Sequence, residues 1–141
     1  MWTLRRVPSQ AALRVKILIA DGHTNYRKFL HTLLKVAPGV EVVGTASDGS
    51  EALELVEKLE PDEVLMDIGI AGIGGLEATR RIKARRKRTR VILLSILADT
   101  AHVVGAQECG ADAFVPKTAS IAVILDLVKK LGEPEAGRKA S

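Results

Sequence analysis

Short aliphatic segments alternate with amphipathic segments along most of this chain, and this alternation constrains the fold more than any other feature. Apolar runs predict buried strands at residues 15–20, 40–43, 64–66, 91–95 and 113–115. Apolar residues at helical spacing follow each run, at residues 26–37, 51–60, 76–86, 100–109 and 121–131. Strict alternation of strand and helix predicts a parallel α/β sheet with right-handed crossovers and helices on both faces.

The two ends of the chain lack this periodicity. We expect a flexible N-terminal tail at residues 1–13, one domain at 14–131, and a C-terminal tail or the start of a linker at 132–141. No apolar run approaches the roughly 20 residues that a membrane helix needs, so we expect no membrane association and a cytoplasmic location. The single cysteine, Cys109, excludes an internal disulfide and is expected to be buried and inert.

Side chains capable of phosphoryl chemistry follow four of the five predicted strands. Asp21 follows the first strand, Asp67 the third, Ser95 ends the fourth, and Lys117 follows the fifth. Ligands of an open parallel sheet bind beyond the carboxyl ends of its strands, so we expect these four side chains to share a cleft. Such a set supports phosphoryl transfer to Asp67, with Mg²⁺ bridging carboxylate and phosphoryl oxygens. Lys117 would neutralise the transferred group and Ser95 would donate a hydrogen bond to it.

Two other kinds of site fit the loop after the third strand less well. The segment from Gly72 to Glu77 lies between a strand and a helix, as a dinucleotide-binding loop does, but Glu77 stands where that motif needs its third glycine. A phosphatase of the haloacid-dehalogenase type needs a second aspartate two residues after Asp67, and Gly69 stands there.

Eight basic residues lie between positions 80 and 90, in a chain with a formal net charge of +4. A charge run of this kind is typical of a solvated helix face, and basic residues near a helix C-terminus are favoured by its dipole. The alternative is an anion-binding accessory domain that uses this stretch to bind an acidic partner. No aromatic residues interleave the basic ones, which argues against base stacking and direct binding of nucleic acid.

Five segments together resemble the receiver domain of bacterial response regulators, and most closely its NarL/LuxR-type subfamily, over residues 14–131. They are Ile17–Asp21, Val64–Ile68, Gly75–Ile82, Ser95 and Gly110–Lys117. The resemblance implies a flavodoxin-like (CheY-like) doubly wound sheet with strand order 2-1-3-4-5. It also implies a role in a two-component phosphorelay, with a sensor histidine kinase or phosphotransfer protein as donor. Such a domain is not an enzyme beyond self-phosphorylation and self-dephosphorylation.

The resemblance also implies a role for each matching residue. Asp67 corresponds to the phosphoacceptor, and Asp21, Asp67 and the main-chain carbonyl of Gly69 correspond to the Mg²⁺ ligands. The phosphoryl-binding and switch positions correspond to Ser95, Phe114 and Lys117. His23 resembles a residue common beside the site, which we interpret as scaffold. Signals of this family leave through the fourth helix, fifth strand and fifth helix, toward an effector domain or a second copy.

The chain departs from the family pattern around the acidic site. Gly22 stands where the family has a second acidic metal ligand, which predicts weakened Mg²⁺ binding. Gly74 replaces an aspartate in the loop after Asp67, and Ile70-Ala71 replace methionine and proline, which loosens that loop. Ile96 is bulky where a small residue is common. These departures leave open an alternative function, that of a degenerate receiver acting as a phosphorylation-independent protein-interaction module.

Overall fold

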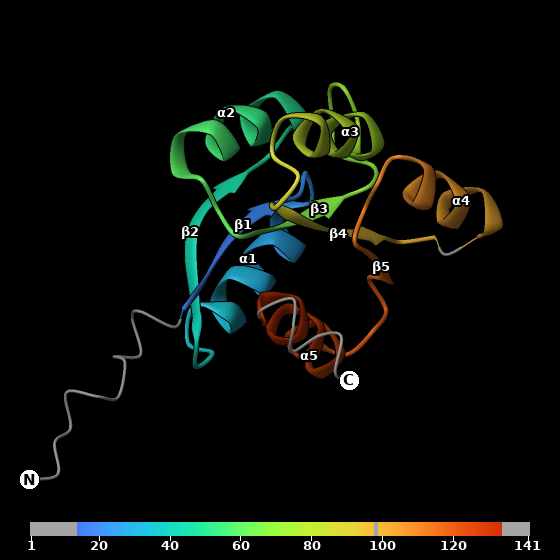
Figure 1. The fold of residues 1–141 in the computed structure, drawn as a ribbon. Coiled ribbons are helices and arrows are strands. Elements are labelled where there is room, and N and C mark those ends of the chain that lie inside the picture. Colours follow the sequence, from blue (N-terminus) through green and yellow to red (C-terminus); the bar gives the residue numbers. More distant parts are fainter. Residues whose placement is uncertain (1–13, 98, 134–141) are drawn as a thin grey trace, which may run out of the picture.

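The structure is a computed structural model that describes residues 14–97 and 99–133. Its five strands form one parallel sheet in the order β2-β1-β3-β4-β5 (Figure 1). The strands are β1 (Val15–Ala20), β2 (Val40–Ala46), β3 (Glu63–Asp67), β4 (Arg90–Ser95) and β5 (Ala113–Pro116). The helices are α1 (Thr24–Leu34), α2 (Gly49–Leu59), α3 (Gly75–Arg85), α4 (Thr100–Glu108) and α5 (Ile121–Gly132). The predicted fold class and strand order are confirmed.

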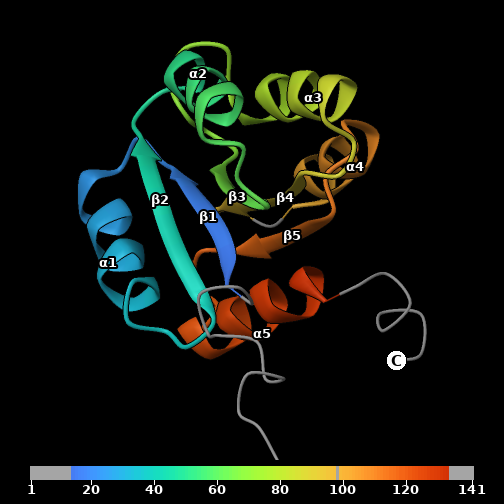
Figure 2. The same ribbon diagram turned by 60° about the vertical axis from the view of Figure 1, so that its left-hand side comes forward.

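The sheet separates two hydrophobic cores, because successive side chains of a strand point to opposite faces. Ile17 and Ile19 of β1 belong to the core that contains buried residues of α1 and α5. Leu18 and Ala20 belong to the other core, with buried residues of α2, α3 and α4. Figure 2 shows α1 and α5 on one side of the sheet and α2, α3 and α4 on the other. Helices therefore cover both faces, as the near-continuous apolar runs of the inner strands require.

Two element boundaries differ from the sequence prediction by three residues, and the others differ by at most two. β2 continues three residues beyond the predicted end at 43, because Gly44, Thr45 and Ala46 pair with the last residues of β1 after a register shift. Glycine and alanine have little intrinsic preference for strands, so only this pairing places them in one. α1 ends at Leu34 rather than at 37, with Lys35 as its C-cap, and Pro38 disfavours the helical conformation in Ala37.

The described residues cover only part of the predicted tails. Residues 1–13 and 134–141 lie outside them. Gly132, predicted to belong to the C-terminal tail, instead ends α5. None of the helices in residues 14–97 and 99–133 has both the length and the apolar character needed to cross a membrane.

Candidate functional site

Three of the four side chains predicted to share a cleft meet at the carboxyl ends of the strands. Asp21 follows β1 and Asp67 ends β3, and their carboxylates are only 1% and 3% exposed. Lys117 follows β5, and its Nζ lies 2.8 Å from Asp21 Oδ2 and 3.3 Å from Asp67 Oδ1. The parallel topology brings these residues together although 46 and 50 positions separate them in the sequence. The predicted convergence of the acids and the lysine is therefore present.

The fourth predicted side chain lies at the end of the neighbouring strand. Ser95 ends β4 and is buried, and its Oγ accepts a hydrogen bond from the Leu97 N–H at 3.1 Å. Its main-chain oxygen accepts the Lys117 N–H at 2.7 Å, which fixes the backbone of Lys117 beside β4. Within the described part of the chain, the Ser95 hydroxyl donates no hydrogen bond. It is therefore available to a ligand at the strand ends.

The charges of this cluster leave a place for a cation. Two carboxylates and one ammonium sum to −1 when His23 is neutral. Asp67 Oδ2 is buried and accepts no hydrogen bond from any described residue. Because buried carboxylate oxygens usually have a partner, this atom can accept one from a ligand. Ligand atoms of Asp21, His23 and Asp67 all lie within 4.8 Å of one another, a separation that one metal ion can bridge.

His23 is more closely involved in the site than the sequence interpretation as scaffold implied. It is the N-cap residue of α1, and its backbone N–H donates to Asp21 Oδ1 at 2.8 Å. Its Nδ1 lies 3.1 Å from that same oxygen, 3.5 Å from Asp67 Oδ2 and 3.0 Å from Lys117 Nζ. The imidazole therefore contacts all three charged groups. Its position two residues after Asp21, at the start of a helix, was the available signal.

Tyr26 is a second residue of the site that sequence reasoning missed. Lys117 Nζ lies 4.7 Å from the centre of the Tyr26 ring, a cation–π distance. Burial, together with the nearby charges of Asp21 and Asp67, raises the pKa of Tyr26 to about 12. The sequence placed Tyr26 only on the apolar face of the first helix. The packing of α1 against the sheet is what brings its ring over the lysine.

The predicted departures from the family pattern lie around this cluster. Gly22 is exposed, and a Cβ atom there would make an ordinary contact with the Ser47 carbonyl at 3.5 Å, so space does not require a glycine. The Gly69 N–H donates to Asp67 Oδ1 at 3.2 Å. Ile96 is 61% exposed and lines a cavity of about 530 Å³ together with Lys117. The bulky side chain therefore lies at the edge of the site.

Phe114 lies away from the charged cluster. It is partly buried against the core beneath α2, α3 and α4. With Val103 and Ala106 of α4 it lines a cavity of about 210 Å³ between α4 and β5.

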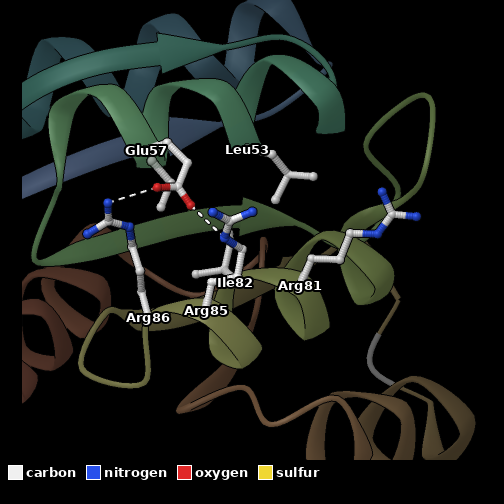
Figure 3. Close-up of a pocket in the computed structure, with 7 residues that line it drawn as sticks. Leu53, Glu57, Arg81, Ile82, Arg85 and Arg86 are labelled. Atoms are coloured by element: carbon white, nitrogen blue, oxygen red, sulfur yellow. Dashed lines mark hydrogen bonds and ion pairs between the residues drawn. The ribbon is translucent and has the colours of Figure 1, made fainter.

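The basic stretch forms ion pairs within the chain. Arg80 and Arg81 pair with Glu77, and Lys83 and Arg90 pair with Asp112. A cavity of about 210 Å³ between α2 and α3 has Arg85 and Arg86 at its rim, both pointing toward Glu57 (Figure 3). Six of the eight basic side chains at 80–90 are thus partnered by the chain's own acids. This arrangement fits a solvated face better than a site for an external anion.

The fold, with two aspartates and a lysine at its strand ends, defines a signalling domain of the receiver class. Residues 17–129 match the family described as the response regulator receiver domain. The chain belongs to this family. Its members are signalling domains rather than classical enzymes, and they generally bind Mg²⁺ at an acidic site.

Similar proteins come from several bacteria. The transcriptional regulatory protein LiaR of Bacillus subtilis is 35% identical over 129 residues, which are 90% of this chain and 61% of LiaR. The nitrate/nitrite response regulator protein NarL of Escherichia coli is 34% identical over 121 residues, 86% of this chain and 55% of NarL. This chain thus spans between half and two thirds of the length of these curated relatives.

Solved structures agree with the assignment. The signal receiver domain of the response regulator NarL from Mycobacterium tuberculosis superposes with a TM-score of 0.76 at 31% identity, covering 82% of this chain and 97% of that one. A two-component response regulator of the LuxR family from Aurantimonas sp. SI85-9A1 gives a TM-score of 0.81 at 31% identity, covering 89% of this chain and 87% of that one. The resemblance to NarL/LuxR-type receivers drawn from the sequence is confirmed.

Proposed function

We propose that this chain relays a two-component signal by accepting a phosphoryl group on Asp67, from a sensor histidine kinase or a phosphotransfer protein. The observation that carries the proposal is the environment of Asp67, whose buried Oδ2 accepts no hydrogen bond from a described residue and whose Oδ1 lies 3.3 Å from Lys117 Nζ. In the transfer, a carboxylate oxygen attacks phosphorus and a P–O bond forms. The bond from phosphorus to the donor breaks, and its electron pair leaves with the donor.

Neighbouring residues have separate parts in this proposed step. Lys117 compensates the negative charge that arrives with the phosphoryl group, and the Ser95 hydroxyl donates a hydrogen bond to a phosphoryl oxygen. Asp21, Asp67 and the Gly69 carbonyl would hold Mg²⁺, and the carboxylate missing at Gly22 weakens its binding. When bound, the ion supplies positive charge to the phosphoryl oxygens. Small phosphoryl donors would allow self-phosphorylation at the same carboxylate.

Output is proposed to leave through the surface of α4, β5 and α5. Phe114 lies beside the cavity between α4 and β5, where a change in its rotamer would alter the packing of α4. Exposed apolar side chains on or beside these elements are those of Leu97 before α4, Val104 on α4 and Val123 on α5. Exposed apolar side chains of this kind fit an effector domain or a second copy of the chain. We infer that residues 14–131 form the receiver unit that carries this relay.

Phosphorylation is tested directly by intact mass spectrometry. The protein is incubated with a divalent salt and acetyl phosphate, beside the variants Asp67→Ala and Asp126→Ala. Asp126 is an exposed acid on α5 and serves as the matched control. We expect a single phosphoryl adduct in the wild type and in Asp126→Ala, and none in Asp67→Ala.

Absence of the phosphoryl adduct would contradict the proposal. If neither Mg²⁺ nor Mn²⁺ supports an adduct while an unrelated receiver labels normally, phosphorylation at Asp67 is refuted. The phosphorylation-independent interaction module is then the better function. Circular dichroism of the three proteins verifies that a missing adduct does not reflect unfolding.

A further inference from the structure

The acidic cluster differs in chemistry from a set of carboxylates, because it contains an imidazole. His23 Nδ1 lies 3.1 Å from Asp21 Oδ1 and 3.5 Å from Asp67 Oδ2. Asp67 Oδ2 is buried and has no hydrogen-bond partner among residues 14–97 and 99–133. The three residues thus place one nitrogen and two oxygen ligand atoms within 4.8 Å of one another. Gly22 contributes no ligand beside them.

The lysine of the site already interacts with this set of ligands. Lys117 Nζ lies 3.0 Å from His23 Nδ1, 2.8 Å from Asp21 Oδ2 and 3.3 Å from Asp67 Oδ1. When His23 Nδ1 accepts from the ammonium, its proton is on Nε2 and its lone pair points into the cluster. That lone pair is the one a metal would take. The ammonium and a metal ion therefore compete for this nitrogen and for the negative charge of the same two carboxylates.

We propose that His23 takes the place of the missing acid as a metal ligand, so that this site binds imidazole-preferring divalent ions such as Co²⁺ and Zn²⁺ through Asp21, His23 and Asp67. Mg²⁺ prefers oxygen ligands and gains little from an imidazole, whereas first-row transition metals bind imidazole well. This proposal rests on the proposed function in one respect only, which is that both place the metal ion at the same site. Binding is measured without a phosphoryl donor, so it stands or fails separately.

The other soft ligands of the described chain lie elsewhere. Cys109 is buried, its Sγ donates to the Ala106 carbonyl at 3.2 Å, and burial raises the pKa of its thiol, which disfavours a thiolate ligand. His102 pairs with Asp99 at the start of α4. Because this pair has the same histidine–carboxylate chemistry on another element, it provides a matched control.

The test is a titration of the untagged full chain with CoCl₂ and, separately, MgCl₂, followed by calorimetry and by the visible absorption of bound Co²⁺. The variants are His23→Ala, His102→Ala and Lys117→Met. Losing a direct ligand should cost at least as much as losing a second-shell partner, which is about 10–100-fold in affinity. We therefore expect His23→Ala to weaken Co²⁺ binding at least about tenfold, to change the Co²⁺ spectrum and to leave Mg²⁺ binding within about twofold.

The other variants test whether Co²⁺ binding depends on His23 in particular and on competition with Lys117. His102→Ala should bind Co²⁺ as the wild type does, and Lys117→Met should bind it more tightly because the competing ammonium is gone. His23 makes no side-chain cap on α1, so His23→Ala should keep the fold, and a thermal melt checks this. His23→Gln provides a second variant. If both His23 variants bind Co²⁺ with wild-type affinity and spectrum, the proposal is wrong, whether or not Asp67 accepts a phosphoryl group.

Discussion

The surroundings of Tyr26 determine the pKa of its side chain. Its ring faces the Lys117 ammonium, while its hydroxyl is buried without a hydrogen bond to any described residue. Ionising the phenol would place a third negative charge near Asp21 and Asp67, in a partly buried position. Both effects favour the neutral form, which is why the pKa lies above the ordinary value of 10.0. Because the chain has only one tyrosine, its titration can be followed without interference from another.

We predict that the near-ultraviolet absorbance of tyrosinate develops with a midpoint of about 12 in the folded protein. The folded state keeps the phenol proton where the unfolded state has lost it. The resulting stability is fully present below pH 10 and is lost as pH rises toward 12. Tyr26→Phe should remove this part of the pH dependence of urea unfolding. A titration midpoint near 10 in protein that is still folded would contradict the burial described for Tyr26.

At the scale of elements, the start of α3 lies unusually close to the strand that carries Asp67. A Cβ atom on Gly75 would lie 2.6 Å from Ile68 Cα and would also overlap the Asp67 carbonyl. The Gly75 N–H donates to the Ile68 carbonyl at 3.0 Å. The α3 N-terminus therefore holds the backbone around Asp67 in place.

Gly75→Ala is predicted to cost about 1–3 kcal/mol of unfolding free energy through overpacking. It should also reduce labelling by acetyl phosphate, because relief of the overlap displaces the Asp67 backbone. Gly22→Ala is the matched control, since a Cβ there makes only an ordinary contact at 3.5 Å. Chemical denaturation of the two variants gives the comparison. Equal stability of the two would show that α3 adjusts without strain.

Asp112 joins three elements at the opposite end of the sheet from Asp67. Its Oδ2 accepts the Val91 N–H of β4 at 2.8 Å and lies 2.9 Å from Lys83 Nζ of α3. Asp112 itself immediately precedes β5. In the sequence, Asp112 was only one residue of the segment Gly110–Lys117 that resembles the receiver family. In the structure, its side chain links α3 to β4.

Removing this carboxylate in Asp112→Ala leaves the Val91 N–H without its acceptor and takes the ion-pair partner from Lys83, whose ammonium keeps the Lys87 and Thr89 carbonyls. We predict a loss of about 1–3 kcal/mol in unfolding free energy. Asp126→Ala, at an exposed position on α5, should change stability by less than about 0.5 kcal/mol. Urea denaturation measures both. A loss no larger than that of the control would mean that water replaces the carboxylate at no cost.

For the whole molecule, charge is distributed so that the basic stretch is largely compensated. Arg85 Nε and an Arg86 guanidinium nitrogen lie 3.0 Å and 2.8 Å from the Glu57 carboxylate, which bridges α2 to α3 (Figure 3). The count of eight basic residues at 80–90 therefore overstates the positive potential that this surface presents to an external anion.

Glu57→Gln should release Arg85, leave Arg86 with Glu60 alone, and increase retention on a heparin column. Glu54→Gln on the same helix changes net charge by the same amount but removes no ion pair known for the described residues. We expect Glu57→Gln to elute at higher salt than Glu54→Gln. Equal shifts for the two variants would mean that net charge alone governs retention, and that the ion pairs do not shield the basic stretch.

The sequence by itself determined the order of elements, a parallel sheet with helices on both faces, and the convergence of Asp21, Asp67 and Lys117. These follow from local periodicity and from the rule that parallel strands share their carboxyl ends, so neighbouring residues suffice to infer them. Only the tertiary structure decided the roles of His23, Tyr26 and Glu57, and the extension of β2 to Ala46. Each of these depends on packing between elements distant in sequence, where a side chain's partner, its burial and its charge environment are set by the fold.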